Sequence, residues 1–200
     1  MIFNGELNEK DHGKLALDIT TIMGNARKNK SEIIKFSKKY SEKHNKKVRY
    51  LTHWFKDIEK LKSFQIECFE SIGKKMIEIL EENRCNINKD DYIIEAQRRN
   101  GGFSKEKNRS PFIWHQDGEK SVTIIFYIRK DATILGGNLM IDERFSNGFW
   151  DYFKSSDLVK EIDIYERQCL IFDGEMYHKP MDFSGFGCRD IIVGQFNRIT

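Results

Sequence analysis

Long apolar runs are missing from this sequence: no stretch approaches the roughly 20 residues that a helix needs to cross a bilayer. The first six residues lack a basic segment followed by an apolar one, so we expect no secretory signal. Neither a Cys-x-x-Cys pair nor an internal repeat is present. The cysteines are therefore expected to be buried or free thiols in a reducing compartment. They are Cys68, Cys85, Cys169 and Cys188. These absences favour a cytoplasmic protein without a membrane partner.

Length and composition suit a single globular domain. The chain has 200 residues, of which 39% are hydrophobic, and this is enough to bury a substantial core. The net charge is only +3, although 32% of the residues are charged. We expect one domain over residues 1–200, in which residues 1–88 form a helical support region and residues 89–200 form the catalytic core.

Positive charge is concentrated in residues 25–49. This segment has ten Lys or Arg against two Glu, a local net charge of +8. Clustered basic residues can bind nucleic acid or another polyanion. The other interpretation is a solvated helix face, in a helix capped by Ser31 with an apolar stripe of Ile33, Phe36 and Tyr40. We favour the solvated face, because no nucleic-acid-binding motif accompanies the charge.

A long helix is predicted from about Thr52 to Asn83. Apolar residues recur there at spacings of three to four, with a gap at Gln65. They are Trp54, Ile58, Leu61, Cys68, Ile72, Met76 and Leu80. We expect this apolar face to pack on the outside of β-structure formed by the rest of the chain.

The second half of the chain contains several short strand candidates separated by turn residues. They are Val122–Arg129, Gly136–Ile141, Cys169–Asp173 and Arg189–Phe196. Many short strands of this kind predict an antiparallel sandwich or a jelly roll.

Candidate metal ligands are carried by His115-Gln116-Asp117 and by a distant His178. Residues i and i+2 of a strand point to the same face, so His115 and Asp117 can aim at one ion. Two histidines and one carboxylate form a facial triad that leaves positions of an Fe(II) ion open. A His-x-Asp pair alone is weak, because five histidines produce one by chance roughly one time in three. Arg189, eleven residues after His178, could clamp a carboxylate through two charge-assisted hydrogen bonds.

The order of these motifs resembles that of the Fe(II)- and 2-oxoglutarate-dependent dioxygenases, and among them the prolyl-hydroxylase-like branch. The resemblance spans about residues 92 to 197. It implies a fold of the α+β or mainly β class, a double-stranded β-helix (jelly roll) with N-terminal helices packed on the outside. It also implies that His115, Asp117 and His178 bind iron.

The resemblance further implies which residues hold 2-oxoglutarate. Arg189 would bind the distal carboxylate of this cosubstrate, and Tyr127 would donate its hydroxyl to the same carboxylate. Leu139 would pack against the cosubstrate. The chain departs from the family at two positions. Ile191 stands where many members have Ser or Thr, so that Tyr127 could replace the missing hydroxyl. Gln195 stands where relatives often place an aromatic residue.

Two segments of the core are longer than simple turns. Residues 98–109 could form a mobile substrate loop, since long loops without secondary structure are often functional or disordered. Residues 142–160 contain five aromatic side chains close together in the sequence, and these could bind substrate. The favoured interpretation of the second segment is a small helix pinned to the core by Trp150 and Phe153.

The activity implied by the resemblance is hydroxylation of a peptide residue, an amino acid or another small molecule. Fe(II), O₂ and 2-oxoglutarate would be consumed or bound, with ascorbate as a supporting reductant, and succinate and CO₂ would be released. A carboxylate at Asp117 favours oxygen insertion over halogenation, because related halogenases have a small residue there.

Two alternatives stay open at this point. One is a nucleic-acid demethylase of the same superfamily, which residues 25–49 would support. These demethylases usually carry a second arginine six residues after the first, where this chain has Gln195. The other is an inactive jelly roll that acts as a binding module. That alternative is disfavoured, because a binding module does not need the triad together with Arg189.

Overall fold

The computed structural model describes residues 2–23, 47–53, 63–100, 114–142 and 159–199. Its strands are β1 (Ile2–Glu6), β2 (Lys47–His53), β3 (Ile87–Asn100), β4 (Ser121–Lys130), β5 (Leu135–Gly136), β6 (Leu139–Asp142), β7 (Val159–Ile162), β8 (Gln168–Asp173), β9 (Tyr177–Pro180), β10 (Phe183–Ser184) and β11 (Cys188–Arg198). Its helices are α1 (Glu9–Met23) and α3 (Ser63–Glu82).

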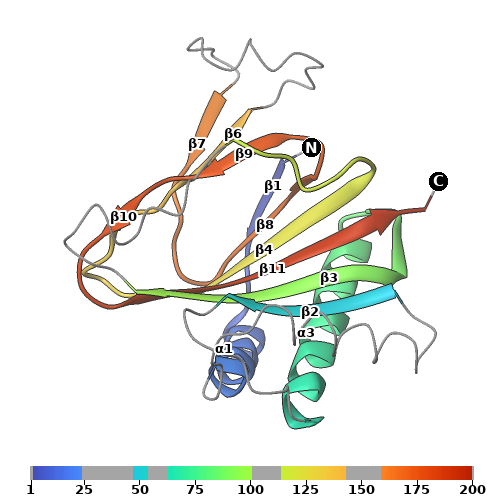
Figure 1. The fold of residues 1–200 in the computed structure, drawn as a ribbon, viewed down its shortest axis with the longest axis horizontal. Coiled ribbons are helices and arrows are strands. Elements are labelled where there is room, and N and C mark those ends of the chain that lie inside the picture. The colour runs from blue at the N-terminus through green and yellow to red at the C-terminus, as the bar shows by residue number, and fades with distance from the viewer. Residues whose placement is uncertain (1, 24–46, 54–62, 101–113, 143–158, 200) are drawn as a thin grey trace.

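The strands form one large sheet and two small ones. The large sheet has the order β1-β8-β4-β11-β3-β2, and the small sheets have the orders β7-β6-β9 and β10-β5. Both helices lie on one face of the large sheet, and the sheet of β6, β7 and β9 lies over the opposite face (Figure 1). The expected jelly roll with helices packed outside is confirmed.

The central strands β4 and β11 are buried on both faces because each face meets a different layer. In β4, Ile124 and Phe126 belong to the core under the helices, together with Ile72 and Met76 of α3. The alternate residues Ile125 and Tyr127 join the smaller core between the sheets. The period of two along a strand therefore divides one apolar run between two cores.

The helix that the sequence predicts from about Thr52 to Asn83 starts too early in that prediction. Residues 47–53 form β2, which pairs in parallel with β3, and α3 begins at Ser63. Val48 and Tyr50 are buried while Lys47 and Arg49 are exposed, and this alternation is typical of an edge strand. The gap at Gln65 is also explained: the buried side chain donates its Nε2 hydrogen to the Ile22 carbonyl, 2.9 Å away, and so joins the two helices.

The N-terminal support region is not only helical. Both β1 and β2 add edge strands to the large sheet, and β3 already starts at Ile87. Arg98 to Asn100, which the sequence assigned to a loop over 98–109, belong to β3, and the remainder of that segment lies outside the described residues. Long-range pairing of β3 with β11 decides this, and no local pattern signals it.

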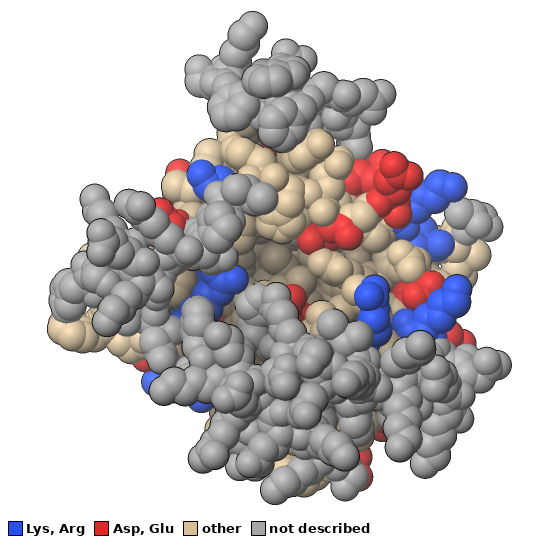
Figure 2. All heavy atoms as spheres, viewed as in Figure 1, with Lys and Arg blue, Asp and Glu red and all other residues tan. Residues whose placement is uncertain are grey.

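Other expectations fall partly outside the described residues. These are the helix stripe of Ile33, Phe36 and Tyr40, and most of the segments 98–109 and 142–160. All four cysteines are free thiols, as expected. Neither described helix is long and apolar enough to span a membrane. The face seen in Figure 2 carries acidic and basic side chains side by side at its right, next to a central hollow.

A substitution at Gly194 tests how closely α3 packs on β11. A Cβ at Gly194 would lie 2.5 Å from the Met76 sulfur and 2.9 Å from the Phe196 ring. Gly194→Ala should therefore lower the free energy of unfolding by about 1–3 kcal/mol through overpacking. Gly13→Ala in α1 is the control, because no atom lies within 4 Å of its added Cβ. Thermal melts of the two variants make the comparison, and an unchanged Tm in Gly194→Ala would contradict this account of the interface.

Candidate metal centre and adjoining pocket

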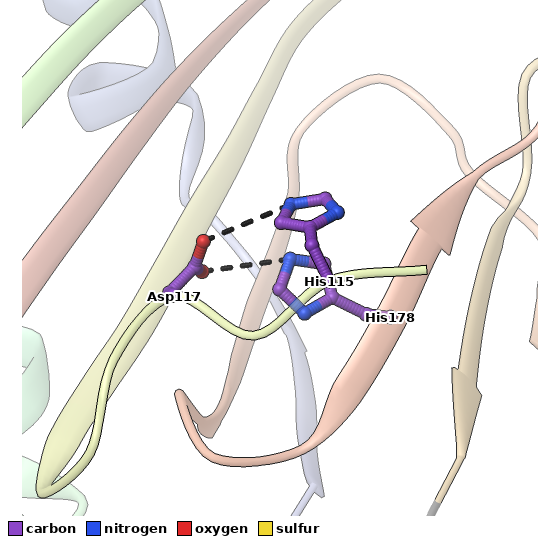
Figure 3. Close-up of side chains that lie close together, drawn as sticks. All are labelled: His115, Asp117 and His178. Carbon is purple, nitrogen blue, oxygen red and sulfur yellow. Dashed lines mark ion pairs between the residues drawn. The ribbon is translucent and has the colours of Figure 1, made fainter. Parts of the chain in front are cut away.

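The three candidate ligands converge from two segments of the chain. His115 forms an isolated antiparallel bridge with His178 of β9, through backbone hydrogen bonds of 3.1 and 2.9 Å. The Asp117 amide donates to the Gly174 carbonyl at 2.9 Å. The His-x-Asp segment is thus not the regular strand that the sequence suggested, since Asp117 lies at a bend. The backbone bonds nevertheless fix both side chains toward His178 (Figure 3).

The ligand atoms are close enough to share one ion. One atom from each of the three side chains lies within 4.8 Å of the others. Nε2 of His178 is 3.5 Å from Asp117 Oδ2, and Nε2 of His115 is 3.8 Å from Asp117 Oδ1. Two nitrogens and one carboxylate are a donor set that suits Fe(II), Mn(II) or Co(II).

The site is buried on one side and open on the other. The side chains of Asp117 and His178 are 7% and 5% exposed, whereas that of His115 is 43% exposed. An ion held here would therefore have protein on the Asp117 side and accessible positions beside His115.

Neighbouring groups orient two of the ligands. The buried Thr123 hydroxyl donates to Asp117 Oδ2 at 2.6 Å. His178 Nδ1 donates to the Met176 carbonyl at 3.1 Å, which leaves Nε2 as the lone-pair nitrogen that faces Asp117. Burial lowers the pKa of His178, although the Asp117 carboxylate opposes this shift. The neutral imidazole is the form that binds a metal.

Arg189 lies at the other end of the pocket as a buried cation. Its Nη1 donates to the Gly137 carbonyl at 2.8 Å, and its Cζ lies 4.7 Å from the centre of the Phe183 ring. Its Nε is buried without a hydrogen-bond partner among the described residues. Burial lowers the Arg189 pKa to about 10, so the guanidinium stays charged at neutral pH. A buried charge in this state suits an anionic ligand.

Tyr127 and Leu139 line the same cavity. Both are buried, and burial raises the pKa of Tyr127 to about 12, so its hydroxyl remains a hydrogen-bond donor. Tyr127 lies opposite Ile191 in the β4–β11 register. The cavity measures about 200 Å³. It is lined by Glu95, Gln97, Arg99, His115, Asp117, Ile125, Tyr127, Leu139, His178, Pro180, Arg189, Ile191, Val193 and Gln195.

Sequence reasoning missed several supporting groups. Thr123 lay inside a strand candidate, and alternation could have placed it on the pocket face. The Gly137 carbonyl and the Phe183 ring hold Arg189 from other strands, and no local pattern signals such contacts. The polar side chains of β3 that line the cavity belong to no sequence motif, and Arg99 lies in a segment that the sequence predicts to be a loop.

Comparisons with known proteins add support for the fold. No protein-family model and no curated protein matches the chain. Among solved structures, IDO from Bacillus thuringiensis has a TM-score of 0.55 at 14% identity, over 100% of this chain and 91% of that chain. The viral collagen prolyl hydroxylase from Paramecium Bursaria Chlorella virus-1 has a TM-score of 0.45 at 17% identity, over 100% and 90%.

A Pseudomonas putida prolyl-4-hydroxylase has a TM-score of 0.40 at 12% identity, over 70% of this chain and 68% of that chain. The first of these similarities shows a shared fold.

Thr123 provides a test of how the metal site is held. Thr123→Val removes the hydroxyl that orients Asp117 and keeps the side-chain shape, so Mn(II) affinity should fall about 10- to 100-fold. Thr123→Ser keeps the hydroxyl and should retain most of the affinity. His178→Ala removes a ligand and should reduce binding further, whereas His12→Ala should not. Calorimetric titration with Mn(II) measures all four. Equal affinities in the Val and Ser variants would show that the hydroxyl has no such role.

Proposed function

We propose that this protein is an Fe(II)- and 2-oxoglutarate-dependent dioxygenase that hydroxylates an amino acid or a peptide residue. One observation carries the proposal: a two-histidine, one-carboxylate cluster shares a small cavity with a buried arginine. Neither feature is needed for the core of the fold, because each places polar groups where apolar ones would pack.

The residues at the metal end fit Fe(II). His115, Asp117 and His178 would hold the ion, and they supply nitrogen and carboxylate donors without a thiolate. The Thr123 hydroxyl and the Met176 carbonyl already fix the orientation of two of these ligands. This fixed arrangement reduces the reorganisation needed when an ion binds.

The residues at the Arg189 end fit a carboxylate. The guanidinium has a buried Nε with no hydrogen-bond partner among the described residues. The neutral Tyr127 hydroxyl is a second donor in the same cavity. A dicarboxylate such as 2-oxoglutarate could meet the Arg189 end with one carboxylate and the metal end with its oxo-acid group.

Iron and 2-oxoglutarate, when bound, supply the oxidation: one oxygen atom of O₂ enters a substrate C–H bond, and the other leaves in succinate with release of CO₂. The chain positions the reactants. Asp117 and the histidines fix the metal end, and Arg189 fixes the far end. Leu139, Ile125 and Ile191 form the apolar wall between them.

A nucleic-acid substrate is the weaker reading of the same cavity. Gln195, not an arginine, faces the pocket at the position where the related demethylases carry their second arginine. Basic and acidic side chains are mixed in the described part of the face in Figure 2. Most of the basic segment 25–49 lies outside the described residues, so it adds no support.

The experiment that tests the proposal is succinate formation. Protein supplied with Fe(II), ascorbate, O₂ and 2-oxoglutarate should release succinate slowly, and faster with a substrate. The panel contains free amino acids, peptides and methylated oligonucleotides, and mass spectrometry reads the products. A +16 Da product is expected on an amino acid or a peptide, whereas loss of a methyl group from a nucleobase would indicate a demethylase. Iron binding without succinate under any condition would indicate a binding module.

Binding of 2-oxoglutarate separates the roles of Arg189 and Tyr127. Arg189→Leu should weaken binding about ten- to hundredfold or more, because a charged contact in a buried site contributes roughly 1.5–3 kcal/mol. Tyr127→Phe should cost about 1 kcal/mol, the contribution of one neutral hydroxyl. Mn(II) affinity should persist in both variants. Arg129→Leu is the control, since that arginine is exposed and pairs with Asp131. If Arg189→Leu and Tyr127→Phe lost equal affinity for 2-oxoglutarate, the main role assigned to Arg189 and the minor role assigned to Tyr127 would be wrong.

A further inference from the structure

The pocket face of the large sheet has an apolar half and a polar half. On β4 and β11 the residues that line the cavity include Ile125, Ile191 and Val193. On β3 the lining residues are all polar, and they occupy alternate positions. They are Glu95, Gln97 and Arg99, which we call the β3 row. The metal ligands, Arg189 and Tyr127 account for the proposed cosubstrate chemistry, but the β3 row has no part in it.

Strand pairing places the β3 row alongside the line that joins the two ends of the pocket. Arg99 lies opposite Arg189, and Glu95 lies opposite Val193. Two residues farther along β11, Gln195 pairs with Thr123, which holds Asp117. Glu95 is therefore nearer the metal end, whereas Arg99 is at the Arg189 end.

The chain already uses a neighbouring arginine for structure. Arg98 binds Asp190 through two hydrogen bonds of 2.7 Å, and Asp190 is buried. Arg99 faces the cavity instead, where burial lowers its pKa and the Glu95 carboxylate opposes the shift. Its positive charge also contributes to the lowered pKa of Arg189. Two cations side by side repel each other, and this favours anionic ligands at that end of the pocket.

We propose, building on the function above, that the β3 row binds the substrate and that the substrate is a free amino acid. Glu95 receives the ammonium group, Arg99 receives the carboxylate, and Gln97 lies between them as a neutral hydrogen-bonding group. Opposite charges on one strand face select a ligand that carries both charges and disfavour one whose ends are capped. The residues of the β3 row are thus specificity-determining residues.

The size of the cavity agrees with a small substrate. The cavity, which would also hold the cosubstrate, measures about 200 Å³, below the roughly 300–1,000 Å³ of pockets that enclose drug-sized ligands, so only a small substrate fits beside it. The wall formed by Ile125, Leu139 and Val193 would face the aliphatic part of the amino acid, while the β3 row holds its charged groups.

Binding measurements test the proposal without relying on turnover. Calorimetry on Mn(II)- and 2-oxoglutarate-loaded protein compares the twenty standard amino acids with the N-acetyl and amide forms of each one that binds. We expect at least one free amino acid to bind, with each cap weakening binding about ten- to hundredfold through loss of a charged contact. The same amino acid should stimulate succinate formation and gain 16 Da.

Two variants assign the charges separately. Glu95→Gln should abolish the preference for a free amine over its N-acetyl form and keep the preference for carboxylate over amide. Arg99→Gln should abolish the preference for carboxylate over amide and keep the preference for a free amine over its N-acetyl form. Glu81→Gln, on α3 beneath the other face of the sheet, and Arg129→Gln are matched controls that should change neither preference. A Glu95–Arg99 pair that only stabilised the sheet would lower Tm in both variants and leave both preferences intact, and this result would overturn the proposal.

The remaining outcomes separate this inference from the proposed function. Binding of none of the twenty amino acids, or equal binding of capped forms, would overturn the inference, even if succinate still formed with a peptide. Selective binding that depends on Glu95 and Arg99, without succinate or a hydroxylated product under any condition, would support the inference about binding and reject the dioxygenase reaction.

Discussion

The pocket is organised around one buried positive charge. A guanidinium inside a protein is unfavourable unless other groups compensate for its lost hydration. Arg189 has the Gly137 carbonyl and the Phe183 ring as compensation, and it forms no ion pair with a carboxylate of the described residues. Gly137 has a φ of +79°, and a Cβ there would lie 2.8 Å from Arg189 Nη1. The turn between β5 and β6 is therefore shaped to let the arginine reach its carbonyl.

The same strand links this charge to the stability of the fold. Along β11, Ile192 and Phe196 belong to the core beneath the helices, whereas Arg189, Ile191 and Val193 face the cavity. A shift of one residue in register would exchange the two sets, so packing against α3 also fixes the orientation of Arg189. The core beneath the helices thus fixes the register of a strand that lines the pocket.

The sequence predicted the features that depend on short periods. Short apolar runs between turn residues located β4, β8 and β11. The His-x-Asp spacing paired His115 with Asp117, and the family resemblance added His178, which the structure places beside them. Features that depend on distant partners were not predictable. The edge strand β2 forms because β3 is available to pair with it. The role of Arg99 follows from its pairing opposite Arg189, which no local pattern reveals.

Departures from simple core patterns mark the site more clearly than any single motif. A sheet buried between two layers favours aliphatic residues on both faces, and the helix-facing positions of β3 follow this rule with Ile94 and Ala96. The cavity-facing positions of the same strand break it with Glu95 and Arg99. Charged residues at positions where packing favours aliphatic ones are typical of functional sites, so their concentration on one face of one sheet points to binding there.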